Sequence, residues 1–248
     1  MHRSRLRRIV VRVVLAAVAL VVVLVMAAVG LLVAAPSVAG APALVRASVA
    51  EHHGQLDPPP PPARVADSVT AIEDHFVGGP PGFDIVYGAA RYVWTHLVLG
   101  RPNQGGSTIA QQLAKRLYTG ARTGLGAKLE EIGLALKLEL TYSPSQLLSM
   151  YLNDDYFGHG AYGVVEAAQT YFGRTPSELS WAQAAMLGGL VQAPSAYDPY
   201  AHPVLARQRQ LEVIGELQAT GVLSPGAARA VEREPLGLAG APSASSTG

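Results

Sequence analysis

The most regular hydrophobic pattern in the chain is an unbroken apolar run near its N-terminus. Residues 13–35 are all apolar apart from Gly30. A helix rises about 1.5 Å per residue, so a run of this length crosses a hydrocarbon core of about 30 Å. The pattern predicts one transmembrane helix at 13–35.

Basic side chains precede this run and indicate its orientation. Residues 1–12 contain five arginines and no acid. Because basic flanks stay on the cytoplasmic side, we expect 1–12 in the cytoplasm and the rest of the chain outside the plasma membrane. A cleaved signal peptide is the alternative, since the residues at 37–41 are small. The apolar region of such peptides is typically about 7–15 residues, which is shorter than this run.

Periodic apolar positions predict helices beyond residue 64. Apolar residues recur every three or four positions at Leu125, Leu129, Ile132, Leu136 and Leu140, which is helical spacing. Ser143 followed by Pro144 indicates the start of the next helix, because serine caps and proline fits a first turn. Residues 180–183 have the form of a capping box. Alternating strand patterns are scarce, so the predicted fold class is mostly α.

Composition divides the remaining chain. Residues 36–63 contain the run Pro58–Pro62 and are predicted to form an extended, proline-rich connector. Residues 64–234 hold the helical pattern and are predicted to form the main domain. Residues 235–248 are rich in Gly, Ala and Ser and are predicted to be a flexible tail.

An apolar, aromatic segment at 84–99 stands apart within the main domain. Only Asp84, Arg91 and His96 in it can carry charge near neutral pH. Core packing is one interpretation. The other is contact with the bilayer interface, where Trp and Tyr are favoured.

The charge distribution excludes one class of partner. The chain has 248 residues, of which 49% are hydrophobic and 15% charged, so it is not broadly disordered. Five of its 19 basic residues precede the apolar run, which leaves 14 against 18 acids and a net charge of −4 for the rest. Nucleic acid is therefore not an expected partner. With no cysteine, the chain has no disulfide or thiolate metal site.

The densest polar stretch lies at 105–115, with the sequence GGSTIAQQLAK. Backbone N–H groups at a helix N-terminus, together with Ser107 and Thr108 hydroxyls, suit a phosphate. Gln111 and Lys115 are four residues apart and share a helix face. The stretch predicts either an anion site or an ordinary capped surface helix.

This stretch resembles the second of five motifs of the peptidoglycan glycosyltransferase family. That domain occurs alone in monofunctional enzymes and fused to a transpeptidase in penicillin-binding proteins. The other motifs resemble, in order, residues 71–74 with 82–84, 128–131 with 138–139, 150–158 with 162–163 and 167–168, and 179–199. The resemblance covers about 65–223.

The resemblance implies a lysozyme-like α-helical fold and the polymerisation of lipid II into glycan strands. It assigns Glu73 as the base that takes a proton from the acceptor sugar, and Glu131, with Glu130 as the neighbouring alternative, as the second acid. The donor diphosphate region would contain Ser107, Thr108, Gln111, Gln112, Lys115 and Lys128. A divalent cation, Mg or Mn, is often used there in the family, and no organic cofactor is expected. The implied partners are lipid II, the growing glycan strand, the plasma membrane and other cell-wall synthesis proteins.

The residue types agree with this chemistry. Negative charge grows on a departing lipid diphosphate, so cations such as Lys115, Arg122 and Lys128 must already be in place. The attacking alcohol is a poor nucleophile, which a carboxylate base assists by about 10²–10⁴-fold. A single displacement would invert an α-linked donor to a β-linked product. Paired carboxylates also serve hydrolysis, and the phosphate-type motif favours transfer instead.

The sequence departs from the family pattern in two motifs. Val77 and Pro80 stand where the family usually has an aromatic residue and a histidine. Ala127 stands where the third motif usually has arginine, and Arg122 is the candidate replacement cation. These departures keep a second hypothesis open, in which the chain is a catalytically weak, membrane-bound scaffold for cell-wall assembly.

Overall fold

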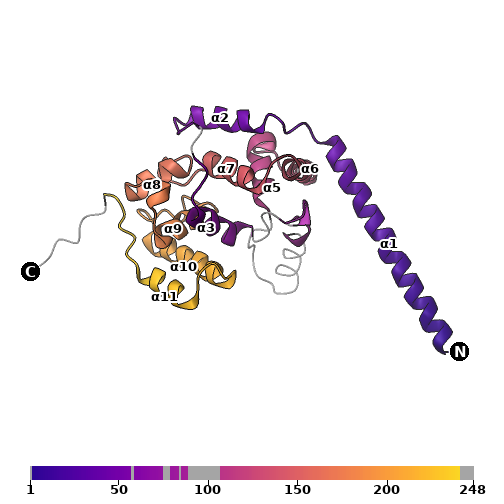
Figure 1. The fold of residues 1–248 in the computed structure, drawn as a ribbon. Coiled ribbons are helices and arrows are strands. Elements are labelled where there is room, and N and C mark those ends of the chain that lie inside the picture. The colour runs from indigo at the N-terminus through magenta and orange to yellow at the C-terminus, as the bar shows by residue number, and fades with distance from the viewer. Residues whose placement is uncertain (1, 57–58, 75–78, 84, 89–106, 241–248) are drawn as a thin grey trace, which may run out of the picture.

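A computed structural model describes residues 2–56, 59–74, 79–83, 85–88 and 107–240, which fold mostly into helices (Figure 1). The helices are α1 (His2–Ala34), α2 (Ala41–Glu51), α3 (Ala63–Glu73), α5 (Ile109–Ala114), α6 (Leu125–Thr141), α7 (Pro144–Asp154), α8 (Val164–Phe172), α9 (Trp181–Leu190), α10 (Pro203–Ala219) and α11 (Pro225–Arg233). A π-helical turn, Lys115–Thr119, continues α5. The described ranges contain no strand, only a single antiparallel bridge between Tyr156 and Tyr162. The predicted mostly-α class is confirmed.

The helix at the centre of the domain is α9. Its residues from Ala182 to Leu190 are all buried, as expected for a helix that is apolar on every side. Two glycines let neighbouring helices approach it closely. A Cβ at Gly188 would lie 2.9 Å from the Ser68 carbonyl oxygen of α3, and one at Gly189 would lie 2.9 Å from the Arg209 Cγ of α10. This packing sets the position of α3, which ends at Glu73.

Local sequence signals place the helix starts correctly. Helix α6 occupies nearly the whole predicted segment 125–142. The Ser143 hydroxyl accepts a hydrogen bond from the Gln146 backbone N–H, and the Gln146 side-chain oxygen accepts one from the Ser143 N–H. Ser180 and Gln183 form the same capping box at α9. These predictions are confirmed because a cap depends on neighbours within one turn.

Helix α1 extends away from the domain as a long apolar rod (Figure 1). Its segment Val11–Ala34 has a mean hydropathy of 3.1, and an 18-residue window of it is not buried in the protein. This is one helix long and apolar enough to cross a membrane, as predicted.

The C-terminal end of α1 is docked on α6. A Cβ at Gly133 would lie 2.6 Å from the Leu31 carbonyl oxygen, so only glycine permits this approach. The Lys137 ammonium donates to the Ala35 carbonyl, which closes the helix end. The Tyr142 hydroxyl donates to the Val38 carbonyl at 2.9 Å. The apolar rod is therefore held at a defined angle to the domain.

Two domain predictions need correction. The predicted connector 36–63 contains helix α2, whose buried face of Ala41, Val45 and Val49 belongs to the core. The described part of the predicted tail is also docked. The Gln183 amide donates to the Leu236 carbonyl at 2.9 Å, and the Ala239 N–H donates to the Tyr171 carbonyl at 2.8 Å. In both cases the contacts join segments far apart in the sequence, which local sequence patterns do not reveal.

Several predictions fall outside the described residues. The aromatic segment 84–99 does so except for 85–88. The same holds for Val77, for the start of the proline run at Pro58, for Gly105 and Gly106 of the polar stretch, and for 241–248.

The docking of α1 predicts opposite effects at two glycines of α6. Gly126→Ala has no atom within 4 Å of its new methyl group and should stabilise the helix by up to about 1 kcal/mol. Gly133→Ala places its methyl against the Leu31 carbonyl and should destabilise the protein by about 1–3 kcal/mol. Thermal unfolding of the two variants measures this, and equal stabilisation by both would contradict the packing of α1 on α6.

Candidate active site

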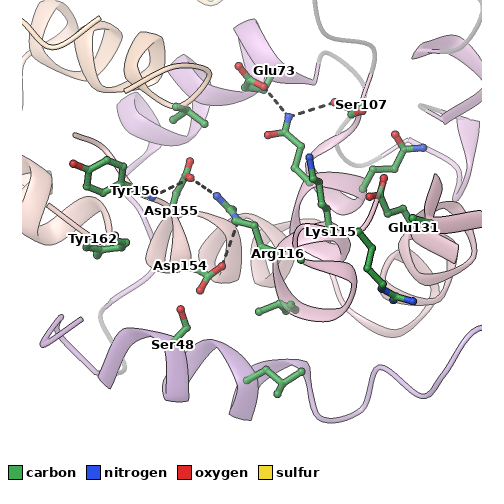
Figure 2. A pocket seen from close by; sticks show the side chains of 18 of the residues that line it. Ser48, Glu73, Ser107, Lys115, Arg116, Glu131, Asp154, Asp155, Tyr156 and Tyr162 are labelled. Carbon is green, nitrogen blue, oxygen red and sulfur yellow. Dashed lines mark hydrogen bonds and ion pairs between the residues drawn. The ribbon is translucent and has the colours of Figure 1, made fainter. Parts of the chain in front are cut away.

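A cavity of about 1100 Å³ lies between α2, α5, the start of α6 and the loop after α7 (Figure 2). It collects residues that are far apart in the sequence. The predicted site residues that line it are Glu73, Ser107, Gln111, Gln112, Lys115, Arg122, Lys128 and Glu131. Of the nine predicted residues, Thr108 alone is missing from the lining.

Glu73 stands at the end of α3, where the helix meets the cavity. Its side chain is 10% exposed. The Gln112 amide donates to Glu73 Oε2 at 2.7 Å. The nearest charge to Oε1 that the structure shows is the Arg209 guanidinium of α10, at 3.7 Å. The carboxylate is thus oriented on one oxygen, while the other has a cation nearby but outside hydrogen-bond distance.

The N-terminus of α5 is already occupied by protein groups. The Thr108 hydroxyl accepts a hydrogen bond from the Gln111 N–H at 3.1 Å, and the Gln111 side-chain oxygen accepts one from the Thr108 N–H at 3.3 Å. The Asp74 carboxylate accepts from the Ile109 N–H at 3.1 Å. Thr108 is 3% exposed and caps the helix, and its role in holding a phosphate stays a prediction. An aspartate takes the place at the helix end that the sequence suggested for an anion.

Two of the predicted cations are paired with acids. Lys128 Nζ lies 3.1 Å from Glu131 Oε2 and donates to the Ser107 hydroxyl at 3.1 Å. Arg122 lies 3.0 Å from Glu130 Oε2. Of these acids, only Glu131 lines the cavity.

Lys115 differs from these two cations. It is exposed, lines the cavity, and its ammonium has no ion pair or hydrogen bond to any side chain within the described ranges. Its charge is therefore available to an incoming anion without breaking an existing pair.

Glu131 is buried beside these cations. Its Oε1 accepts from the Thr119 hydroxyl at 3.2 Å, and its Oε2 faces Lys128. The carboxylate thereby ties the turn after α5 to α6. Both oxygens of this buried acid already have partners. Glu131 is therefore a structural counter-charge for Lys128 as well as a candidate catalytic acid.

An acidic pair at the end of α7 was not predicted. Arg116 pairs with Asp155 Oδ1 and lies 3.3 Å from Asp154 Oδ2 (Figure 2). Burial raises the pKa of Asp155 to about 7, the Arg116 charge opposes that rise, and the Glu73 charge adds to it. The adjacent acids were visible in the sequence, but their pairing with Arg116, 39 residues away, was not.

Helix α2 supplies a wall of the cavity that the sequence interpretation missed. Ser48 and Glu51 line it, and His52, which follows the helix, stacks on Tyr162 with 3.7 Å between ring centroids. Tyr156 is tilted against Tyr162 at 4.7 Å. The prolines near this helix led to the prediction that residues 36–63 form a connector.

The expected divalent cation finds no ready set of ligands. Within the described residues there is no group of three or more His, Asp or Glu side chains that could hold a metal ion. A divalent cation at this cavity stays a prediction.

Comparison with known proteins identifies relatives of most of this domain. Residues 47–218 match the Transglycosylase family. Penicillin-binding protein 1A of Neisseria flavescens is 39% identical over 66% of this chain and 20% of its own length. The Aquifex aeolicus protein of the same name is 40% identical, over 66% and 22%. A Cupriavidus necator protein named as a transglycosylase is 37% identical, over 71% of this chain and 76% of its own. This chain thus spans about a fifth of the penicillin-binding proteins it matches.

The raised pKa of Asp155 predicts a pH-dependent stability. The folded protein keeps this proton up to about pH 7, whereas the unfolded chain loses it near the ordinary value of 3.8. Stability from this group therefore falls as pH rises between these values and is constant above them. Asp155→Asn cannot titrate. The unfolding temperature of the natural protein minus that of Asp155→Asn should decline by several degrees across this window.

A difference that stays flat or increases with pH would contradict the burial of Asp155. Asp154→Asn is the matched control, because Asp154 is the sequence neighbour of Asp155 and its side chain also faces Arg116.

Proposed function

The chain belongs to the transglycosylase family, and on that premise we propose that it polymerises lipid II into glycan strands with release of polyprenyl diphosphate. The observation that carries the proposal is one cavity that contains an oriented carboxylate, Glu73, and a cation, Lys115, with no ion pair in the described part of the chain. Glycosyl transfer from a diphosphate needs both groups.

In this proposal Glu73 is the base. The Gln112 hydrogen bond holds one oxygen, which leaves Oε1 to accept the proton of an acceptor sugar hydroxyl. The Arg209 guanidinium lies 3.7 Å from Oε1, beyond hydrogen-bond distance, so this oxygen stays open to the sugar hydroxyl. The hydroxyl oxygen then attacks the anomeric carbon of the donor while the diphosphate departs. One displacement inverts the donor's α linkage to β.

The leaving diphosphate is proposed to meet Lys115 first. An opposite charge at 4 Å gains about 4 kcal/mol at an effective dielectric of 20, before desolvation is subtracted. Lys128 is held at the cavity by Ser107 and Glu131, so it must exchange its ion pair to serve a phosphate. Arg122 must likewise leave Glu130, and it is the proposed replacement for the arginine missing at Ala127.

The membrane end of the molecule supports the choice of a lipid-linked substrate. The docking of α1 on α6 fixes the position of the cavity relative to the bilayer that α1 would cross.

We propose that residues 1–12 lie in the cytoplasm and the domain lies outside the plasma membrane. Protease added to spheroplasts should then digest the domain, and a protected domain would contradict this orientation. Association with other cell-wall synthesis proteins stays a prediction.

Glu73→Gln tests the base directly. The amide keeps the shape of the side chain and cannot accept the proton, so polymerisation of lipid II by the purified full-length variant should fall at least about 10²-fold. Unfolding temperature serves as the control for folding. Near-normal polymerisation by a folded variant would reject the assignment, and an inactive parent protein would instead favour the scaffold hypothesis.

Lys115→Ala tests the anion site. Charge on the leaving oxygen grows during the reaction, so loss of this cation should lower turnover by roughly tenfold as well as affinity. Lys128→Ala should also lower turnover, and it additionally leaves the buried Glu131 carboxylate without its cation, so it should lower the unfolding temperature too. Arg229→Ala, an exposed site on α11 outside the cavity, is the matched control. Turnover of Lys115→Ala equal to that of the control would place the anion site elsewhere.

A further inference from the structure

A buried tyrosine stands behind the candidate base and reaches it through one amide. Tyr151 of α7 is fully buried. Its hydroxyl donates to Gln112 Oε1 at 2.8 Å, and Gln112 Nε2 donates to Glu73 Oε2 at 2.7 Å. The three side chains come from α7, α5 and α3 and form a continuous chain of hydrogen bonds.

The direction of these bonds depends on the hydroxyl. A glutamine amide has one accepting end and one donating end of nearly the same shape. If its oxygen accepts a hydrogen bond from the Tyr151 hydroxyl, its NH₂ group must face Glu73. With the amide reversed, its oxygen would face the carboxylate, and two acceptors in contact repel each other. Glu73 and the Ser107 carbonyl, 3.4 Å from Nε2, accept hydrogen bonds from the NH₂ end, and the Tyr151 donor at the other end favours the same orientation.

Neighbouring groups hold Tyr151 in this role. The Arg116 guanidinium lies 4.3 Å from the centre of the Tyr151 ring, and it donates to the Tyr151 carbonyl at 3.2 Å. Arg116 is itself fixed by Asp154 and Asp155. Burial, and then the charges of Asp155 and Glu73, raise the pKa of the Tyr151 hydroxyl well above its usual value, while Arg116 opposes them. The hydroxyl therefore keeps its proton throughout the range in which a carboxylate base is ionised.

We infer that Tyr151 is a positioning residue: its hydroxyl fixes the direction of the Gln112 amide, and the amide holds the Glu73 carboxylate ready to accept the proton of the acceptor sugar. The catalytic part of this inference rests on the proposed function. It also changes the role expected for Gln112, which supports the base through both ends of its amide instead of binding the donor diphosphate.

Tyr151→Phe removes the hydroxyl and leaves the ring under Arg116. With purified full-length protein and lipid II, kcat should fall about tenfold, the loss expected for one hydrogen bond of this kind. KM should stay within about twofold, because the substrate does not touch Tyr151. Tyr118→Phe is the matched control, since the Tyr118 hydroxyl is buried, has no hydrogen-bond partner among the described residues and is not in the cavity lining.

A double variant separates positioning from general structural support. If Tyr151 acts through Gln112, the combined Gln112→Ala and Tyr151→Phe protein should be no slower than Gln112→Ala alone. Effects on kcat that multiply would overturn the inference, as would a Tyr151→Phe protein with the kcat of an active parent.

A second readout does not depend on turnover. The side-chain amide NMR signal of Gln112, identified by its loss in Gln112→Ala, should shift in Tyr151→Phe and stay in place in Tyr118→Phe. A parent without turnover would contradict the proposed function. The amide signal would still show whether the Tyr151 hydroxyl fixes the orientation of the Gln112 amide. An unmoved signal in Tyr151→Phe overturns the inference whether or not the parent is active.

Discussion

The close packing of α3 and α10 on α9 determines where the candidate base stands. Side chains at Gly188 and Gly189 would push these two helices away, and with them the end of α3 and the buried Arg209. Glu73 is the last residue of α3, so its position follows from a helix contact and not from a loop. Helix α5 then brings Gln112 against it, and α7 places Tyr151 behind Gln112. A base held by rigid elements keeps one orientation, which general-base catalysis requires.

The second constraint is electrostatic. Carboxylates removed from water need partners, and within the described ranges Glu131 and Asp155 each have a cation. Lys128 is the partner of Glu131, and Arg122 pairs with Glu130, so two of the three cations that the sequence offered to a diphosphate already have an acidic partner. Among the described residues Lys115, the third of these cations, has no acidic partner, and it lies on the turn that directly continues α5. Substrate binding on this account begins at Lys115, and the other cations contribute once they exchange partners.

Local patterns in the sequence predicted much of the fold and part of the site. Helix α6, the serine caps and the apolar N-terminal helix follow from neighbours within a few residues, which a sequence displays directly. The capping role of Thr108, the pairing of Arg116 with Asp155 and the support of Glu73 by Gln112 depend on contacts between distant segments. Helix α2 was missed for the same reason, because its small apolar face is buried by packing on α7 and on the turn Lys115–Thr119, which are distant in the sequence.

The central claim is that this cavity joins sugars by a single inverting displacement of a lipid diphosphate. The most direct measurement is the anomeric configuration of the linkages that the purified full-length protein forms from lipid II, together with the diphosphate released for each linkage. The account predicts only β linkages and one polyprenyl diphosphate for each. Linkages of α configuration, or free disaccharide without any polymer, would contradict it.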